Sequence, residues 1–342
     1  MRLEDLDYEL PPELIAQHPA ARREDSRLLV LERTSGALHD QRFTDLRRWL
    51  RSGDALVLNE TRVRPARLVA RRPTGGAVEL LFVRPEADGR WRVLAKPAKR
   101  AQPGTRLTVE GADLVLEVSG VGESGERIVA VTRGDLDATL RALGDIPLPP
   151  YIHRPTEPAD RERYQTVYSR TEGAVASPTA GLHFSESMLA QLEAAGVERV
   201  NVLLHVGPGT FRPVTASDPN RHVMDEEWFE VAAEAAASLR DARARDGRIV
   251  AVGTTAVRAL ESACDANAGE LQAASGWTRK YILPPYRFQA VDALLTNFHL
   301  PRTTLLLLVA AFSGEGLLRQ AYAHAVRERY RFYSYGDAML VV

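Results

Sequence analysis

The octapeptide Ser52-Gly53-Asp54-Ala55-Leu56-Val57-Leu58-Asn59 joins a turn to an apolar run that ends on a polar residue. Ser-Gly-Asp is typical of a turn, and an unbroken apolar run of this length is typical of a buried strand in a parallel sheet. Such strands belong to α/β proteins, which place their chemistry at the strand ends. The stretch therefore predicts an α/β fold with functional groups at and just beyond Asn59.

The sequence on both sides of this octapeptide has the same α/β character, but the segment in between differs. Residues 27–32 alternate apolar and polar side chains as a strand does, and after the proline-rich residues 146–150 the helical segments 185–195 and 232–245 alternate with apolar strands. From about residue 63 to residue 146, short strand-like runs are separated by glycine-rich turns, which favours a small barrel. We expect an α/β main domain built from both ends of the chain, residues 1–60 and 147–342, with an inserted β-barrel-like domain, residues 61–146.

Composition sets further bounds. The chain has 342 residues, is 45% hydrophobic and has a net charge of -1, so it can bury a substantial core and shows no global sign of a polyanionic partner. The single cysteine, Cys264, cannot form an internal disulfide and is expected to fill the core, and the eight histidines lack metal-ligand spacing. The acidic N-terminus is unlike a secretory signal, and the longest apolar run, residues 303–312, is too short to cross a bilayer. We expect a cytoplasmic monomer with no metal and no membrane contact, and a strand or core helix at residues 303–312.

Positive charge gathers in one segment of the predicted insertion. Residues 62–106 hold 12 lysines and arginines against three acids, a net charge of +9. Such a segment can track a phosphate backbone, although a solvated basic face is the alternative. Its sharpest clusters are Arg62, Arg64 and Arg67, then Arg71-Arg72, then Lys96-Pro97-Ala98-Lys99-Arg100.

Five stretches combine small residues, hydroxyls and ionisable groups next to apolar strands. They are residues 176–184, with Ser185 placed to cap a helix, residues 202–212, residues 249–258, with Thr254 or Thr255 as a helix cap, residues 296–301 and residues 330–339. Backbone turns of this kind let an anion or a ribose approach closely. The alternatives are an ordinary strand-to-helix connection for residues 176–184, a buried core histidine for residues 296–301 and core packing of the aromatic side chains for residues 330–339. None of them is a GxGxxG fingerprint, a P-loop or a nucleophile elbow.

Taken together and in order, the motifs resemble those of the S-adenosylmethionine:tRNA ribosyltransferase-isomerases of queuosine biosynthesis. The clearest are Pro178-Thr179-Ala180-Gly181-Leu182-His183-Phe184 and Thr296-Asn297-Phe298-His299-Leu300-Pro301. The resemblance extends over residues 7–11, 26–30, 58–63, 97–100, 163–168, 205–207, 209–214, 252–255, 291–294 and 334–340. Asp225 departs from the pattern, since the family usually has a histidine there.

The resemblance implies that the chain transfers the ribosyl part of S-adenosylmethionine, a consumed co-substrate, to 7-aminomethyl-7-deazaguanine at the tRNA wobble position. The products would be epoxyqueuosine-tRNA, adenine and methionine. Proton removal next to the sulfonium and protonation of the departing adenine both need positioned side chains. As hypotheses we take His183 and His205 as proton carriers, Glu227 as a base or amine partner, and Asp337 as a substitute for either.

The remaining assignments concern the two substrates. The donor pocket would contain Thr179, Gly181, Gly209, Thr210, Gly253, Thr254 and Thr255, with Arg258 near the methionine carboxylate. Phosphates of the anticodon stem-loop would meet Arg62, Arg64, Arg67, Lys96, Lys99 and Arg100. The modified base would be read by Asn59, Asn297, His299 and Tyr335.

Two rival functions use the same features. An S-adenosylmethionine-dependent RNA methyltransferase would release S-adenosylhomocysteine and usually has a glycine-rich turn after its first strand, where this chain reads Val30-Leu31-Glu32-Arg33-Thr34. A noncatalytic RNA-binding module would use the basic insertion alone. It would leave the glycine, hydroxyl and histidine turns without a purpose.

Overall fold

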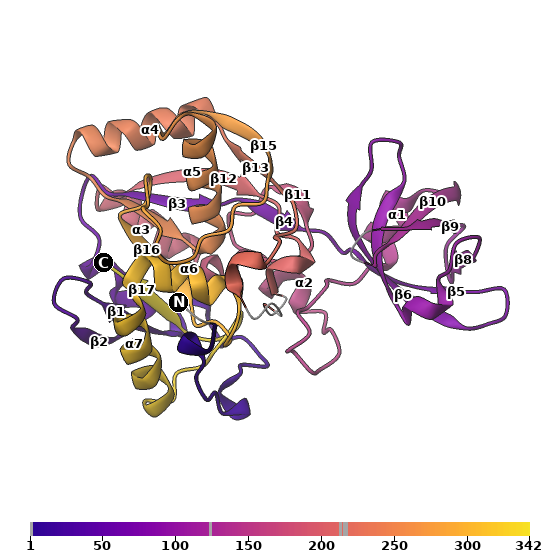
Figure 1. Cartoon of the computed structure of the whole chain (residues 1–342), viewed down its shortest axis with the longest axis horizontal. Helices are drawn as coiled ribbons and strands as arrows, with labels where there is room; N and C mark the ends of the chain where they lie inside the picture. The colour runs from indigo at the N-terminus through magenta and orange to yellow at the C-terminus, as the bar shows by residue number, and fades with distance from the viewer. Residues whose placement is uncertain (1–2, 123–124, 212–213, 215–217) are drawn as a thin grey trace.

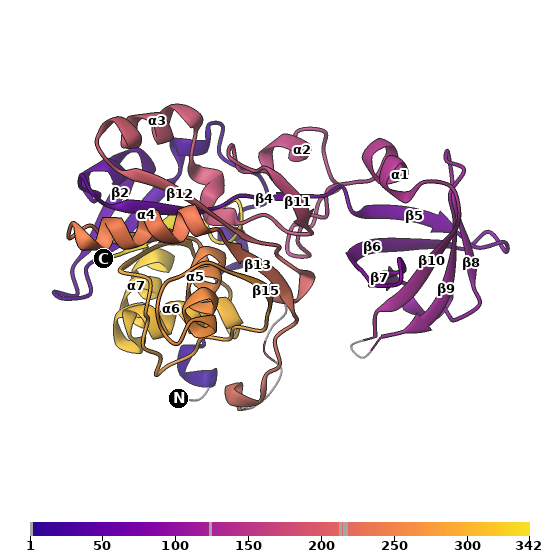
Figure 2. The ribbon, with the colours of Figure 1, turned by 90° about the horizontal axis from the view of Figure 1, so that it is seen from above.

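The computed structural model describes residues 3–122, 125–211, 214 and 218–342, and they form a large α/β domain joined to a smaller barrel (Figure 1). Both ends of the chain lie in the α/β domain, and the barrel stands to one side of it (Figures 1 and 2). The predicted fold class, an α/β domain built from both ends of the chain around a β-barrel insertion, is confirmed. The exact domain boundaries, residues 60/61 and 146/147, remain a proposal.

A nine-stranded sheet organises the α/β domain. Its order is β15-β13-β12-β3-β14-β16-β17-β1-β2. The strands are β1 (Arg27–Leu31), β2 (Leu38–Arg42), β3 (Ala55–Asn59), β12 (Glu198–Leu204), β13 (Glu227–Val231), β14 (Ile249–Val252), β15 (Ala274–Thr278), β16 (Ala293–Asn297) and β17 (Ala338–Val341). The strand predicted from the octapeptide is β3, which pairs in parallel with β12 and β14.

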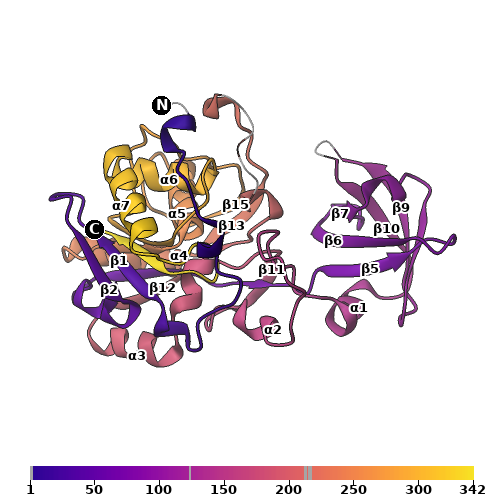
Figure 3. The ribbon, with the colours of Figure 1, turned by 90° about the horizontal axis from the view of Figure 1, so that it is seen from below.

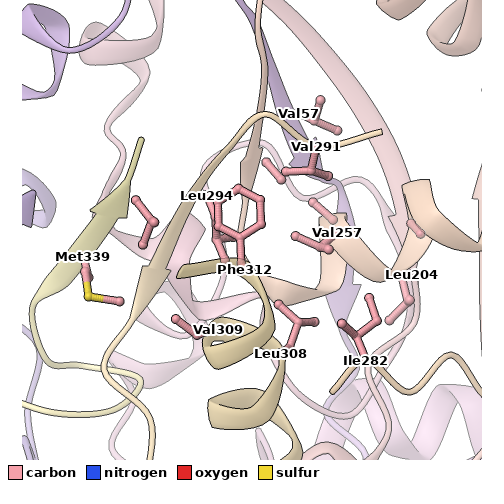
Figure 4. Close-up of a cluster of buried hydrophobic side chains, with 14 of the residues drawn as sticks. Val57, Leu204, Val257, Ile282, Val291, Leu294, Leu308, Val309, Phe312 and Met339 are labelled. Carbon is pink, nitrogen blue, oxygen red and sulfur yellow. The ribbon is translucent and has the colours of Figure 1, made fainter. Parts of the chain in front are cut away.

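Helices cover both faces of the sheet, which explains why β3 is apolar at successive positions rather than at alternate ones. Ala55 and Val57 belong to the core beneath the helices α4 to α7, while Leu56 and Leu58 pack on the other face with α3. Figure 4 shows the first of these cores, with Val57 and side chains from α5 and α6 in one cluster. The helices of the chain are α1 (Leu136–Leu143), α2 (Asp160–Arg163), α3 (Glu186–Ala194), α4 (Ala233–Ala244), α5 (Thr254–Ala266), α6 (Thr304–Ser313) and α7 (Glu315–Arg327).

The first residues of α6, α3 and α5 test three predictions made from the sequence. The apolar run at residues 303–312 forms the core helix α6 and not a strand, with Thr303 as its cap. Ser185 caps α3 as predicted, because its side chain accepts a hydrogen bond from the amide of Met188. The expectation that Thr254 or Thr255 caps α5 was wrong: the cap is Gly253, with a φ of 87° that favours glycine. Both threonine side chains are therefore available to the cavity described below.

The insertion is a closed six-stranded barrel in the order β10-β7-β6-β5-β8-β9. Its interior is filled by apolar side chains such as Leu80, Val93 and Leu116, which are fully buried, whereas the neighbours of Leu80 and Val93 along their strands are only partly buried. The strands are β5 (Arg67–Arg71), β6 (Ala77–Pro85), β7 (Trp91–Lys96), β8 (Arg106–Val109), β9 (Val115–Val121) and β10 (Arg127–Arg133). A separate pair, β4 (Thr61–Val63) with β11 (Thr171–Ala174), lies between the sheet and the barrel.

The barrel also touches the α/β domain at a second point. Arg84 at the end of β6 lies 3.3 Å from the carboxylate of Glu226, and its guanidinium stacks on Trp277 of β15 at 4.8 Å. Arg279 reaches the same carboxylate at 3.2 Å. The connection through β4 is thus supplemented by a charged contact beside the start of β13.

Asp54 fixes the start of the central strand. Its carboxylate is fully buried and accepts hydrogen bonds from the amides of Arg51 and Arg248 and from the Arg248 side chain, at 2.7 Å for Nη2. Burial alone would raise the pKa of this carboxyl, but the hydrogen bonds from Arg248 and Arg51 lower it below its ordinary value. The network ties β3 to β14 at the edge opposite the site.

Replacing Asp54 with Asn should lower the free energy of unfolding by about 3 kcal/mol, because it leaves the Arg248 guanidinium without its buried partner. Urea unfolding followed by circular dichroism measures this change. Asp113→Asn is the control, since Asp113 forms an exposed pair with Arg133 and should lose less than about 1 kcal/mol. Equal losses in the two variants would contradict the anchoring role of Asp54.

Candidate active site

One edge of the sheet collects the polar groups. The parallel strands β3, β12, β14 and β16 all end there, while β1, β13 and β17 run the other way and begin there. Ser26, Asn59, His205, Gly253 and Asn297 therefore come to the same side of the molecule, although they are far apart in sequence. The connection to the barrel leaves from this edge as well (Figure 3).

Two adjoining cavities of about 20 Å³ each lie at this edge. They share Thr179, Thr210, Asn297 and His299 as lining residues, and one of them also touches Gly253, Thr254 and Thr255. Seven residues predicted from four separate stretches are thus brought together. The predicted glycines Gly181 and Gly209 do not line these cavities. They let the backbone approach the Tyr168 hydroxyl and the Asp225 carboxylate, where a Cβ would clash.

Hydroxyl groups without hydrogen-bond partners indicate which kind of ligand the cavities could bind. The side-chain oxygens of Ser177, Thr255 and Tyr333 are buried and have no hydrogen-bond partner among the described residues. A polar ligand with hydroxyl and amine groups would satisfy them, since buried polar atoms are nearly always paired. Ser177 and Tyr333 were not predicted as site residues. Both lie in stretches singled out from the sequence, but only packing reveals where a side chain in a turn points.

The cavities are smaller than the ligand such hydroxyls imply. Pockets for drug-sized ligands usually measure about 300–1,000 Å³. A ligand of that size would have to displace side chains that line both cavities, such as Thr210 and Leu305. Arg212, which follows Thr210 in the predicted site stretch, lies outside the described residues.

His299 is the imidazole that lines both cavities. Its Nε2 lies 2.8 Å from the Thr296 hydroxyl, and its backbone is held by hydrogen bonds with the hydroxyls of Tyr322 and Tyr8. Burial lowers the pKa of His299 to about 3, so the ring is neutral at physiological pH. A neutral imidazole can donate a hydrogen bond through one ring nitrogen and accept one through the other, so the ring can orient a bound ligand.

His183 lies behind Asn297 and does not line the two cavities. The amide of Asn297 donates to its Nε2 at 3.1 Å, and its Nδ1 lies 2.7 Å from the Ser26 hydroxyl. Thr179 donates to the Asn297 carbonyl oxygen, which fixes the orientation of that amide. Burial lowers the pKa of His183 to about 3, and the charges of Arg331 and Arg23 act in the same direction.

His205 and Glu227 are each held by their own partners. The Nδ1 of His205 lies 2.8 Å from the Thr61 hydroxyl, and burial followed by the charge of Arg64 lowers its pKa to about 4. Glu227 accepts hydrogen bonds from the Gly207 amide, the Thr210 hydroxyl and the Arg258 guanidinium. The Glu227–Arg258 pair is buried on both sides, so it holds the turn that carries Thr210.

Three further predicted residues have structural partners. Asp337 accepts hydrogen bonds from the amides of Arg27 and Arg331 and so closes the starts of β1 and β17. Asn59 is fully buried and bonds to the backbone of Leu204, which ties β3 to β12. The Tyr335 hydroxyl donates to Asp160 at 2.9 Å.

The basic residues of the insertion divide into two groups. Arg64 and Arg67 lie near carboxylates, Asp137 at 2.6 Å and Glu79 at 3.9 Å. The other four predicted phosphate contacts, Arg62, Lys96, Lys99 and Arg100, are exposed and form no ion pair within the described part of the chain. The side chain of Arg100 lies beside that of Arg72 across Gly76. We call Arg72, Lys96, Lys99 and Arg100 the barrel patch.

Two absences concern the described residues alone. No group of three or more His, Cys, Asp or Glu side chains is arranged there to hold a metal ion. No helix in this part of the chain is long and apolar enough to span a membrane.

The buried neutral histidines predict acid sensitivity. Below pH 6.5 the unfolded chain protonates both His183 and His299, whereas the folded protein does so only near pH 3, so the free energy of unfolding falls as the pH drops from 6.5. At about pH 5.5 each histidine should lower it by about 1.4 kcal/mol. Urea unfolding at pH 7.5 and 5.5 measures the difference, which His183→Asn should reduce. Equal stability at the two pH values would contradict the buried neutral state.

Comparisons with known proteins identify the family. The family described as Queuosine biosynthesis protein matches residues 3–341. The S-adenosylmethionine:tRNA ribosyltransferase-isomerase of Symbiobacterium thermophilum is 51% identical over 344 residues, and that of Moorella thermoacetica is 50% identical over 345; both alignments cover 100% of each chain. A crystal structure of S-adenosylmethionine tRNA ribosyltransferase from Thermotoga maritima matches with 38% identity and a TM-score of 0.57, over 99% of this chain and 100% of that one. The chain therefore belongs to the S-adenosylmethionine:tRNA ribosyltransferase-isomerases, the queuosine biosynthesis family that its motifs resemble.

Proposed function

We propose that the chain transfers and isomerises the ribosyl group of S-adenosylmethionine onto 7-aminomethyl-7-deazaguanine at the tRNA wobble position. The products are epoxyqueuosine-tRNA, adenine and methionine. The observation that carries this proposal is the identity of 50–51% with named relatives over the whole chain. The cavity with three unpartnered hydroxyls supports it, because a ribose and an amino acid present the complementary groups.

The donor would lie across the two cavities. Ser177, Thr179, Thr210, Thr255 and Tyr333 offer hydroxyls to its ribose and amino groups. The sulfonium of S-adenosylmethionine acidifies the hydrogens on the adjacent C5′, so one nearby side chain must take a proton. A second group must give a proton to the departing adenine, and water must be excluded.

His299 is the best placed group to carry a proton. It is the histidine that lines both cavities, it is neutral, and Thr296 fixes the orientation of its ring. His183 acts through Asn297 as a positioning residue, since its ring bonds to the amide that lines the cavities. His205 and Glu227, each held by close partners, keep the surrounding turns in place.

The RNA would approach from the barrel side of the sheet edge. The barrel patch gives it three exposed cations, Lys96, Lys99 and Arg100, and the half-buried Arg72, none of which forms an ion pair in the described chain. We assign no metal ion to the reaction, because side chains supply the proton transfers and neutralise the phosphates. The enzyme would act as a monomer in the cytoplasm, where its RNA substrate is found.

Product analysis tests the function directly. The purified protein is incubated with S-adenosylmethionine and with tRNA that carries the aminomethyl-deazaguanine base, and the products are identified by mass spectrometry. Adenine, methionine and a heavier tRNA base are expected. S-adenosylhomocysteine would reveal a methyltransferase, and tight RNA binding without turnover would reveal a binding module. EDTA should leave the rate unchanged.

Replacing His299 with Gln should lower kcat by about 100-fold or more, the usual effect of losing a proton carrier, and leave the Kd for tRNA within about twofold. Single-turnover kinetics and RNA binding measure the two quantities. His153→Gln is the control, because His153 is exposed and lines neither cavity. An unchanged kcat in His299→Gln would remove His299 from the chemistry.

Replacing Lys99 with Gln should weaken tRNA binding severalfold and reduce the slope of log Kd against log salt concentration by about 1, since one phosphate contact is lost. The kcat at saturating tRNA should stay the same. Arg71→Gln serves for comparison, because Arg71 of the same barrel already pairs with Glu110 at 3.0 Å. If both variants bind tRNA as the parent protein does, the barrel patch is not an RNA surface.

A further inference from the structure

Arg23, Arg163 and Arg331 line one small cavity of about 20 Å³ at the same sheet edge, and we call it the arginine pocket. They come from three distant parts of the chain: the turn before β1, the end of α2 and the segment between α7 and β17. His183 and Gly336 also line the cavity. No function assigned above uses these three arginines.

Backbone carbonyl groups hold two of the three guanidinium groups. Arg23 donates to the carbonyl oxygens of Leu182 at 3.2 Å and Glu162 at 3.0 Å. Arg163 donates to those of Ala20 at 2.7 Å and Ala21 at 3.0 Å. Carbonyl groups orient a guanidinium but do not neutralise it. The two arginines are therefore fixed in place with their full charge.

The carboxylates nearby are mostly engaged elsewhere. Asp337 lies 3.5 Å from Arg331, but it already accepts hydrogen bonds from two backbone amides. Asp160 pairs with Arg154 through two hydrogen bonds, at 2.7 and 2.8 Å. The Glu162 side chain is exposed and acts on Arg23 only at longer range. Three cations thus share one carboxylate within contact distance among the described residues.

The arginines also show the effect of this crowding. Burial and then the charge of Arg163 lower the pKa of Arg23, the direction expected when a guanidinium is desolvated beside another cation. The Nε of Arg163 is buried and has no hydrogen-bond partner in the described chain. The pocket therefore has both an excess of positive charge and an unused donor.

We propose that the arginine pocket binds a phosphate group of the substrate RNA, next to the nucleotide whose base is modified. The cavity admits a group about as large as one water molecule, which suits the exposed oxygens of a backbone phosphate and not a whole nucleotide. Guanidinium groups are well suited to phosphate because their planar forks donate two hydrogen bonds at once. The anion site stands on its own geometry, but its assignment to RNA rests on the proposed function.

The arginine pocket is separated by one side chain from the two adjoining cavities at the sheet edge, which we call the reaction cavities. His183 lines the arginine pocket and bonds to Asn297, which lines both reaction cavities. A phosphate held here would place its nucleotide at the sheet edge beside the donor. The barrel patch and the arginine pocket would then contact different phosphates of the same RNA.

The test uses Arg331→Gln, because Arg331 does not hold neighbouring backbone as Arg163 does. Binding of an anticodon stem-loop RNA is measured over a range of salt concentrations. The variant should bind about tenfold more weakly with a salt slope reduced by about 1, and Arg331→Lys, which keeps the charge, should recover most of the affinity. Arg245→Gln is the matched control, since Arg245 is exposed and pairs with Glu198 at the opposite edge. Melting temperatures verify that each variant is folded.

A methylphosphonate scan identifies the anion. Each phosphate on either side of the modified nucleotide is replaced in turn by its uncharged analogue. One replacement should weaken binding to the parent protein about tenfold but have little further effect on Arg331→Gln, because the two changes remove the same contact. Additive losses at every position would overturn the proposal.

Two other results would also overturn it. An unchanged affinity for RNA with a higher KM for S-adenosylmethionine would mean that the pocket holds the carboxylate of the donor. Unchanged affinity for both substrates would mean that the arginines only join segments of the fold. These binding measurements do not depend on turnover. If Arg331 is coupled to one phosphate but the protein transfers no ribosyl group, the proposed function is refuted and the phosphate site is still supported.

Discussion

The pairing of β3 with β12 on one side and β14 on the other fixes where the functional loops begin. Asp54 ties the start of β3 to β14, and Asn59 ties its end to β12. Because the three strands are parallel, the segments that follow them emerge at the same edge. The hydroxyls, His299 and the connection to the barrel therefore meet at one place, although they come from several distant parts of the chain.

Local sequence patterns predict where the strands and helices of this fold lie better than they predict which residues each side chain contacts. The β3 strand, the barrel and the cap at Ser185 follow from turn residues, apolar runs and side chains that act within a few residues. The capping error at α5 has a similar local origin, because a glycine at a positive φ can replace a hydroxyl cap. The resemblance to a known family supplies the function, which the patterns alone do not name.

The site was harder to predict because burial decides the role of each side chain. His183 and His299 look alike in sequence, yet one lies behind Asn297 and the other lines the cavities. Asn59 is polar and lies at a strand end, but its side chain forms hydrogen bonds with the backbone of Leu204. Charge counts mislead in a similar way. The segment with a net charge of +9 has many of its arginines in ion pairs, whereas the arginine pocket is assembled from isolated residues that no local count detects.

The strand order also bears on how the chain folds during its synthesis. β1 pairs with β2 a few residues later, but its parallel partner on the other side, β17, is among the last strands made, about 300 residues later. At translation rates of roughly 5–20 residues per second, β1 must wait about 15–60 s on the ribosome. The barrel is closed by strands from a single continuous segment and can form in that interval. The edge of β1 that awaits β17 is then the surface for which a chaperone would matter most.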